Sequence, residues 1–436
     1  MKKIIFFILF LSSFSIHTQW VIQPSGITNS LRSVVFYYSG YYNNGYFPNL
    51  GFAVGLGGKI LRSTNGGLLW TPVSSGTTQD LYSVSFGQVF DSLNVIACGA
   101  NGTILRSTNA GISWVQSVSG TTSSLRSISY NGAIVGRVYF AAGDNGVIMN
   151  SANGIGWERD TSGSTAQLNS TVYFYNSTSG FRTYACGNSG TMLKSVDYVS
   201  DFNYTFAVDT NFHSTDNLLG MTYTYNPLIY YNGVIFVSTE GGKIFKTRIN
   251  QYTIVTPWTQ FNSGVTVPLR SMAAYRSKVW AVGDNGNIRV SADTGNTWTG
   301  QTGFTTSNLY GIFMLDSIHG WIVGDNGAIS NTLNGGGPIG IQKISSEVPS
   351  GFSLSQNYPN PFNPTTNIHF AIPKSSFVKL VVYDMQGREI ETIVNENLKA
   401  GIYNAGWDAS GFASGVYFYK LISADYSQTK KMIVLK

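Results

Sequence analysis

The sequence predicts an all-β protein, with a seven-bladed β-propeller followed by a small immunoglobulin-like antiparallel β-sandwich. Three observations lead to this prediction. The 436 residues include 49 Gly, 26 Tyr, 26 Phe and 9 Trp, and only 11% are charged. Such a composition favours short strands and tight turns. A glycine-containing phrase also recurs seven times, and the composition changes after residue 350. The recurrence predicts a propeller, and the change predicts a second domain.

Residues 1–18 are expected to be a signal peptide. Lys2 and Lys3 form a charged start, and Ile4 to Leu11 form the apolar segment that follows. No cysteine follows that segment, so a lipid anchor is not expected, and no later stretch is long and apolar enough to span a bilayer. The net charge of +6 is scattered along the chain. Nucleic-acid binding is therefore not predicted.

The repeat is the strongest signal in the chain. A glycine precedes the third apolar run of each copy, at intervals of 41 to 52 residues: Gly58, Gly102, Gly146, Gly190, Gly242, Gly286 and Gly327. Each copy holds four short β-rich runs bounded by Gly, Asn and Ser, which is the content of one propeller blade. The period favours a propeller over a horseshoe or a helical array.

The seventh copy is incomplete, because it stops in Gly335-Gly336-Gly337 without a Trp-led fourth strand. The segment Trp20 to Gly26 matches Trp114 to Gly120. We therefore expect residues 19–334 to form a propeller closed by the N-terminal strand, which also removes an exposed sheet edge. The fifth copy departs from the others because Val196 to Asp216 (196–216) is extra. This segment is either an insertion that shapes one face or a tolerated long loop.

The turns between the third and fourth strands carry a known motif. Ser291 to Trp298 reads S-A-D-T-G-N-T-W, and Ser63 to Trp70 and Ser107 to Trp114 have Asn in place of Asp. This pattern resembles the Asp-box of the bacterial neuraminidase repeat. Its Asp or Asn is expected to cap the turn, and its Trp to pack between blades. Together the repeats resemble the photosystem II assembly and stability factor family, which implies a propeller fold but no particular activity.

Cys98 and Cys186 occupy equivalent places in the second and fourth copies. Equivalent points two blades apart cannot approach within the distance of about 7 Å that a disulfide requires. Two buried free thiols are therefore predicted. Metal binding would need nearby histidines, which the pattern does not supply, and neither a metal nor a cofactor is expected.

A Gly-, Pro- and Ser-rich linker is predicted over 335–350, followed by a sandwich domain over 351–436. This domain is similar to the type A C-terminal sorting domain of the type IX secretion system. The resemblance implies binding to the export machinery, passage through the outer membrane, and a secreted or cell-surface location, with the domain either removed or retained. It is carried by Asn357, Tyr358, Pro359, Asn360, Pro361, Phe362, Asn363, Pro364, Gly387, Arg388, Lys431 and Lys436.

Catalytic residues are not predicted. Sialidases need an arginine cluster and a Tyr-Glu pair, and the Arg-Ile-Pro motif near the first blade is absent. Other glycosidases need two facing carboxylates. The acids Asp144, Asp284 and Asp325 share one repeat position in the phrase Gly-Asp-Asn-Gly, where Asp favours the turn itself.

A second repeated position follows a leucine at the start of the first strand of each copy. Because that strand is innermost in a blade, its start is expected near the central channel. The side chains at this position could bind an anionic or sugar ligand at the channel mouth, or they could cross-link blades by hydrogen bonds. The candidate ring, whose fifth copy reads Gly220, consists of Arg32, Tyr82, Arg126, Asn169, Arg270 and Tyr310.

The predicted function is that of a non-catalytic module that binds a protein or glycan outside the cell. Two alternatives come from other classes. One is a secreted carbohydrate-active enzyme of sialidase-like or other glycosidase type, and the other is a structural surface or adhesion component.

Overall fold

The computed structural model describes residues 20–37, 49–89, 92–131, 138–176, 180–198, 204–225, 233–249, 256–301, 303–332, 335–336, 341–345, 347–362, 365–409, 412–424 and 426–435. The predicted signal peptide, Asn363, Pro364 and Lys436 lie outside these residues. The chain divides into two compact units, one of Trp20–Pro338 and one that contains Ile339–Lys436. Among the described residues, no helix has the length and apolar character needed to cross a membrane.

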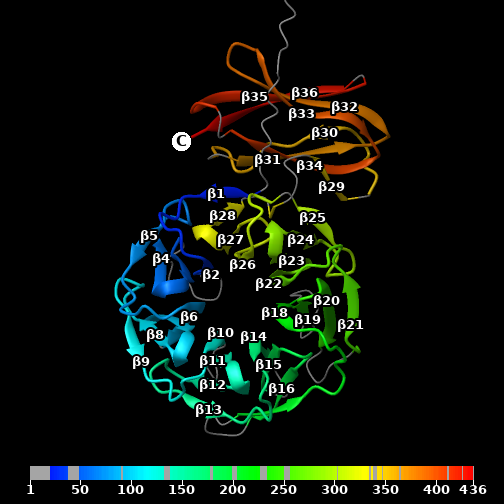
Figure 1. Cartoon of the computed structure of the whole chain (residues 1–436). Helices are drawn as coiled ribbons and strands as arrows, with labels where there is room; N and C mark the ends of the chain where they lie inside the picture. Colours follow the sequence, from blue (N-terminus) through cyan, green and yellow to red (C-terminus); the bar gives the residue numbers. More distant parts are fainter. Residues whose placement is uncertain are drawn as a thin grey trace, which may run out of the picture. The chain divides into compact units, whose positions relative to one another are not determined.

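In the described part of the first unit, the strands form seven antiparallel four-stranded sheets, which confirms the predicted propeller (Figure 1). Blades 1 to 3 consist of β2 (Leu31–Phe36), β3 (Gly51–Gly55), β4 (Lys59–Ser63) and β5 (Thr71–Val73); β6 (Leu81–Val89), β7 (Ser92–Gly99), β8 (Ile104–Ser107) and β9 (Val115–Ser117); and β10 (Leu125–Asn131), β11 (Val138–Gly143), β12 (Ile148–Ser151) and β13 (Glu158–Asp160). Blades 4 to 6 consist of β14 (Leu168–Asn176), β15 (Gly180–Gly187), β16 (Met192–Tyr198) and β17 (Tyr204–Val208); β18 (Leu218–Tyr225), β19 (Gly233–Thr239), β20 (Lys243–Ile249) and β21 (Thr259–Asn262); and β22 (Leu269–Tyr275), β23 (Lys278–Gly283), β24 (Ile288–Ser291) and β25 (Thr299–Gln301). Blade 7 consists of β26 (Leu309–Met314), β27 (Gly320–Gly324), β28 (Ile329–Thr332) and β1 (Val21–Gln23).

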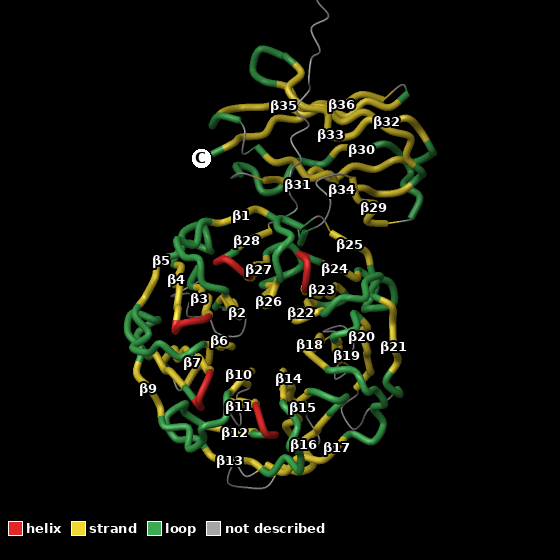
Figure 2. Tube along the Cα trace, in the orientation of Figure 1, coloured by secondary structure: helices red, strands yellow, loops and turns green. Residues whose placement is uncertain are grey.

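Short 3₁₀ turns link the second and third strands in five blades of the described chain, and Figure 2 marks them in red. They are η1 (Leu56–Gly58), η2 (Ala100–Gly102), η3 (Asp144–Gly146), η4 (Asp284–Gly286) and η5 (Asp325–Gly327). The first strand of each blade lines the centre of the ring, and these inner strands contact one another from blade to blade, including β26 with β2.

The N-terminal strand completes blade 7, because β1 pairs antiparallel with β28. The Trp20 side chain is 0% exposed, and its Nε1 donates to the Gln301 side chain of blade 6 at 3.0 Å. Apolar residues of blades 6 and 7, including Trp280 and Ile322, surround it. Burial of an indole ring of this size is worth several kcal/mol. Trp20 therefore anchors the join between the two ends of the propeller.

The predicted linker over 335–350 is wrong in two places. Gly335 and Gly336 belong to the propeller: the Gly335 carbonyl accepts from Trp280 Nε1 at 2.8 Å, and the Gly336 N–H donates to Thr332 Oγ1 at 2.7 Å. The second of these bonds repeats the one from Gly295 to Ser291 in the Asp-box of blade 6. Thr332 thus accepts the bond that Ser291 accepts in blade 6, and the sequence hid this because threonine replaces the usual serine.

The other departure from the linker is β29 (Ile341–Ser345), which pairs with β34 of the second unit. The expectation for Val196 to Asp216 is also corrected. Within that segment Tyr204–Val208 form β17, the outer strand of blade 4, which pairs with β16, so the segment supplies a strand of the blade and is not extra. This blade was misread because it has no Asp-box. Residues 199–203, which separate β16 from β17, lie outside the described residues.

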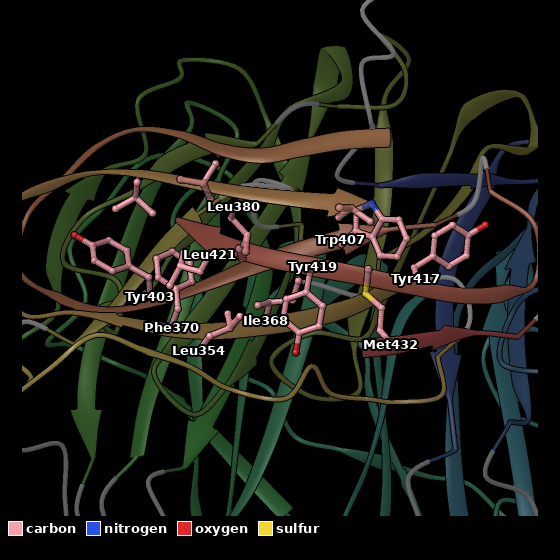
Figure 3. Close-up of a cluster of buried hydrophobic side chains, with 14 of the residues drawn as sticks. Leu354, Ile368, Phe370, Leu380, Tyr403, Trp407, Tyr417, Tyr419, Leu421 and Met432 are labelled. Atoms are coloured by element: carbon pink, nitrogen blue, oxygen red, sulfur yellow. The ribbon is translucent and has the colours of Figure 1, made fainter. Parts of the chain in front are cut away.

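The second unit is a sandwich of two four-stranded sheets in its described part, ordered β29-β34-β31-β30 and β33-β32-β35-β36. Its strands are β30 (Ser353–Leu354), β31 (Thr365–Ile372), β32 (Ser376–Tyr383), β33 (Glu389–Leu398), β34 (Gly401–Asp408), β35 (Gly415–Ser423) and β36 (Tyr426–Val434). Side chains from both sheets, among them Phe370, Trp407 and Tyr419, meet in one buried core (Figure 3). Burial alternates along β35, so the sheet that contains this strand has one inner face.

One buried carboxyl joins two blades of the propeller. Asp160 of β13 is 4% exposed, and its Oδ1 accepts from Asn150 Nδ2 at 2.9 Å and from the Tyr204 N–H of blade 4 at 3.0 Å. Its Oδ2 has no hydrogen-bond partner in the described structure. Burial raises the pKa of this carboxyl to about 7, against the lowering effect of the two hydrogen bonds.

A raised carboxyl pKa makes stability depend on pH. The folded state holds the proton that the unfolded state releases near pH 4, so this group's contribution to stability is lost as the pH rises from about 4 through 7. Asp160→Asn keeps the acceptor oxygen and removes the charge. We expect it to raise the free energy of unfolding at pH 8 by on the order of 2 kcal/mol and to have little effect at pH 4. Urea titrations at both pH values test this, with the exposed Glu347→Gln as control, because Glu158 of the same strand itself raises the pKa of Asp160. Equal gains at both pH values would contradict it.

Candidate functional site: a ring of bulge residues

A β-bulge recurs at the start of the inner strand of every blade. The register between the first and second strands shifts by one residue after each leading leucine, as between Leu125 and Ser127. The residue that is skipped has no partner on the second strand, and a bulge of this kind re-aims its side chain. These seven residues, here called the bulge ring, are Arg32, Tyr82, Arg126, Asn169, Leu219, Arg270 and Tyr310.

The bulge ring contains the six candidates predicted from the sequence and corrects the fifth blade. There the shift lies between Leu218 and Gly220, so the ring residue is Leu219 and Gly220 is not a member. Two consecutive leucines made the one-residue choice ambiguous in the sequence.

A second repeated residue lies beside each bulge. It opens the turn after the second strand, and its N–H donates to the carbonyl of the residue that precedes the leading leucine. In blade 3, for example, the Asp144 N–H donates to the Ser124 carbonyl at 2.9 Å. This bond holds the turn against the bulge. The seven residues, here called the turn residues, are Leu56, Ala100, Asp144, Asn188, Glu240, Asp284 and Asp325.

Bulge and turn residues pair with each other in four blades. Two bidentate ion pairs join Arg126 to Asp144, at 2.5 and 3.2 Å, and Arg270 to Asp284, whose longer contact is 2.8 Å. The hydrogen bond to Asp284 is the main cause that raises the pKa of Arg270. The other two pairs are hydrogen bonds, from Tyr310 Oη to Asp325 at 3.2 Å and from Asn169 Nδ2 to Asn188 at 2.9 Å.

These pairs correct the interpretation of the three acids as residues of the turn alone. The side-chain oxygens of Asp144 and Asp284 accept from arginines, and those of Asp325 accept from Tyr310 and Ser30. The sequence did contain a signal for this, because arginine at the bulge position goes with aspartate at the turn position in blades 3 and 6. The two positions are 18 residues apart in blade 3 and were considered separately.

Blades 1 and 2 differ, because Leu56 and Ala100 stand at their turn positions and offer no polar side chain. Arg32 forms no ion pair or hydrogen bond with the described residues, and its Nε is buried without a partner. Its guanidinium lies 3.7 Å from the ring centroid of Tyr310 in blade 7. The ring of Tyr310 is also approached by Arg270, at 5.3 Å.

Tyr82 of blade 2 lies between two arginines. The Arg126 guanidinium is 5.4 Å from its ring centroid, and the charges of Arg126 and Arg32 both lower the pKa of its hydroxyl. Burial, with smaller effects of Asp80 and Asp144, outweighs them and raises that pKa. From blade 6 to blade 3, passing through blades 7, 1 and 2, the ring therefore alternates arginine and tyrosine. Cation–π contacts of this kind are favourable and hold the side chains in order.

The turns that resemble Asp-boxes follow the third strand of their blades, and they make hydrogen bonds to the neighbouring blade. In blade 6, Asp293 accepts from the N–H groups of Asn296 and Thr297. Burial acts to raise the pKa of Asp293, but hydrogen bonds from Thr297, Ser291 and Asn296 hold it down to about 2. The carbonyl of the fourth box residue accepts from the preceding blade, as Ala110 does from Arg62 at 2.7 Å.

The two cysteines are free and buried, as predicted. Cys98 Sγ donates to the Leu125 carbonyl at 3.4 Å, and burial raises the pKa of both thiols. Both are therefore packed as apolar residues. The described part of the chain holds no group of three or more His, Cys, Asp or Glu side chains placed to share a metal ion.

In the second unit, the opening of the sorting motif packs against the last strand. Asn357 is buried and donates from Nδ2 to Thr366, and the Ile433 N–H donates to Asn360 Oδ1. The ring of Phe362 packs against that of Trp407, with 5.6 Å between the ring centroids. The side chain of Tyr358, by contrast, is 79% exposed.

The other motif residues have separate places. Pro359 contributes a carbonyl that accepts from Thr366, and Pro361 is exposed. Gly387 and Arg388 end the hairpin turn that begins at Asp384, and Arg388 Nε donates to Asp384 at 2.7 Å. The carbonyl of Lys431 accepts from Gln356.

Comparisons with known families agree with both units. Residues 356–435 match the secretion system C-terminal sorting domain, and residues 206–333 match the photosynthesis system II assembly factor YCF48. The protein is thus exported by the type IX secretion system and is secreted or located at the cell surface. A comparison with curated protein sequences gives no match.

Solved structures show the same propeller fold. YCF48 from Cyanidioschyzon merolae has a TM-score of 0.55 and 19% identity over 72% of this chain and 98% of its own. YCF48 bound to D1 peptide has a TM-score of 0.53 and 20% identity over 73% and 96%. The WD40 propeller of Doa1 has a TM-score of 0.54 and 10% identity over 72% and 96%. At these identities, the likeness concerns the fold.

Proposed function

We propose that the propeller is a non-catalytic binding module of this exported protein and that the bulge ring is its ligand site. The observation that carries the proposal is the unpaired Arg32 guanidinium, stacked on Tyr310 at one end of the ring of inner strands. Four of the seven blades satisfy their ring residues internally, whereas blades 1 and 2 present an arginine and a tyrosine with no partner on the neighbouring turn. A propeller of this fold binds a peptide in one of the similar structures, YCF48 bound to D1 peptide.

Two further features support binding over catalysis. Both oxygens of Asp144 and of Asp284 are engaged by arginine, so neither carboxylate is free to act as a nucleophile or proton donor. Each residue of the bulge ring also lies in a β-bulge, and the turn residue beside it is hydrogen-bonded to the start of the same strand. The backbone of the ring is therefore fixed before a ligand binds. The sorting domain accounts for export and leaves the propeller free for a separate task.

The test uses the chain without residues 1–18, applied to arrays of polysaccharides and of random-sequence peptides. We expect binding to at least one class, with a loss of tenfold or more in the triple variant Arg32→Ala, Arg126→Ala, Arg270→Ala. The triple variant Arg159→Ala, Arg248→Ala, Lys374→Ala removes the same charge from exposed positions and should bind normally. Circular dichroism establishes that both variants are folded.

Two results would overturn the proposal. Unchanged binding by the ring variant would exclude the bulge ring as the site. Cleavage of any bound polysaccharide by the wild-type chain would favour the glycosidase alternative.

A further inference from the structure

We infer that the ligand of the bulge ring is an acidic sugar whose carboxylate binds the Arg32 guanidinium. This inference rests on the proposed function and names its ligand class.

The charge of Arg32 is uncompensated within its own blade. In blades 3 and 6 the turn residue is an aspartate that binds the ring arginine in a bidentate pair. In blade 1 the turn residue is Leu56, and Arg32 Nε is buried with no acceptor. A buried donor without a partner is costly, and an incoming acceptor recovers that cost. A carboxylate would restore the arrangement that the neighbouring blades contain, because its two oxygens match the guanidinium geometry.

The surroundings favour a ligand with a single negative charge at this point. Arg126 and Arg270 already have aspartate partners and offer no uncompensated charge. Two carboxylates also flank blade 1: Asp325 is held by Ser30 Oγ at 2.7 Å, and Asp80 accepts from the Gly57 N–H at 2.8 Å. Carboxylates on both sides of blade 1 repel a ligand that carries several close negative groups more strongly than one that carries a single carboxylate. Phosphate-rich ligands and nucleic acids are therefore disfavoured.

Polar and aromatic side chains of blade 2, next to Arg32 in the order of the blades, suit a sugar. In blade 2, the exposed Asn101 donates from Nδ2 to Gln79 Oε1 at 2.8 Å, beside Asp80. Amide and carboxylate groups provide both donors and acceptors for hydroxyl groups. The ring of Tyr82 adds an aromatic surface with a polar tip. A sugar acid combines the carboxylate that Arg32 would bind with hydroxyl groups that such amide and carboxylate side chains can bind.

Leu56→Asp provides the sharpest test, because it supplies Arg32 with the internal partner found in blade 3. Leu56→Asn is the matched control, with the same shape and no charge. The probe is polygalacturonate, compared with its fully methyl-esterified form, in which the sugars are the same and the carboxylates are neutral. Affinities are measured by calorimetry with the chain lacking residues 1–18.

We expect polygalacturonate to bind, its methyl ester to bind at least tenfold more weakly, and both Leu56→Asp and Arg32→Ala to lose binding by a similar factor. Leu56→Asn should bind as the wild type does. Thermal unfolding of Leu56→Asp distinguishes a blocked site from a misfolded one. The turn of this variant begins with Asp, as that of blade 3 does, so we expect a melting temperature close to that of the wild type.

The outcomes separate this inference from the proposed function. If the ester binds as well as the acid, or if Leu56→Asp binds normally while the triple arginine variant does not, the ring is a binding site but the carboxylate assignment is wrong. If an acidic peptide binds in an Arg32-dependent way and no uronate does, the sugar class is wrong. If nothing that binds depends on the ring arginines, the proposed function itself fails.

Discussion

Trp20→Ala is expected to lower the free energy of unfolding of the propeller by about 4 kcal/mol, a typical cost for removing a fully buried tryptophan. The loss has two physical parts. The cavity would lie between blades 6 and 7, among Trp280 and Ile322, and Gln301 would lose the indole N–H that its side-chain oxygen accepts. Because β1 is the outer strand of blade 7, weakening its anchor also weakens the closure of the ring.

Differential scanning calorimetry of the chain without residues 1–18 measures this effect. Ile22→Ala is the matched control, since Ile22 lies on the same strand but is 62% exposed. Its replacement should cost less than about 0.5 kcal/mol. A melting temperature of Trp20→Ala within 2 °C or so of the wild type would show that the closing strand contributes little.

Gly146→Ala is expected to have the second large effect, a loss of about 3 kcal/mol or more. Gly146 has a φ of +65°, and a Cβ at this position would lie 1.8 Å from the Ser164 carbonyl oxygen. The backbone cannot relax easily, because the Gly146 N–H also donates to the Ala166 carbonyl at 2.8 Å. Both the strain of positive φ and the clash therefore oppose a side chain.

The control is Gly120→Ala. Gly120 has a similar φ of +72°, but a Cβ there would meet nothing within 4 Å. This variant isolates the conformational cost of positive φ, about 1 kcal/mol. Urea denaturation of both variants should show the difference, which is due to the carbonyl contact. Equal costs would mean that the turn moves away from the added methyl group.

This contact explains why the sequence was so informative about the fold. In every blade the glycine equivalent to Gly146 lies against a backbone carbonyl, as Gly327 lies against that of Ile27. A residue with a Cβ does not fit there, so glycine recurs once per blade and the repeat is easy to detect in the sequence. The blade count and the closing Trp20 followed from that period and from one matching segment. What the sequence hid were blades with altered markers, namely blade 4 without its Asp-box and blade 7 with Thr332 in place of serine.

The candidate site was only half predictable. The bulge position could be found because a leucine precedes it, and five of its seven residues are Arg or Tyr. The aspartate at the turn position was expected only to favour the turn, because the short motif Gly-Asp-Asn-Gly is a sufficient reason for an aspartate there. The unpaired state of Arg32 depends on Leu56, which has no meaning in the sequence until the two positions are seen side by side.

The pairing of β1 with β28 also has a consequence for the order in which the propeller folds. Blades 1 to 6 are each continuous in sequence, so their hairpins form from neighbouring segments. Blade 7 instead joins residues 309 positions apart, as in the bond from Ser330 to the Val21 carbonyl. Contacts over such a separation form slowly, because a long loop must close first. On a chain that emerges from its N-terminus, β1 appears first and pairs last, so the ring reaches its closed state only after the whole propeller sequence has been released.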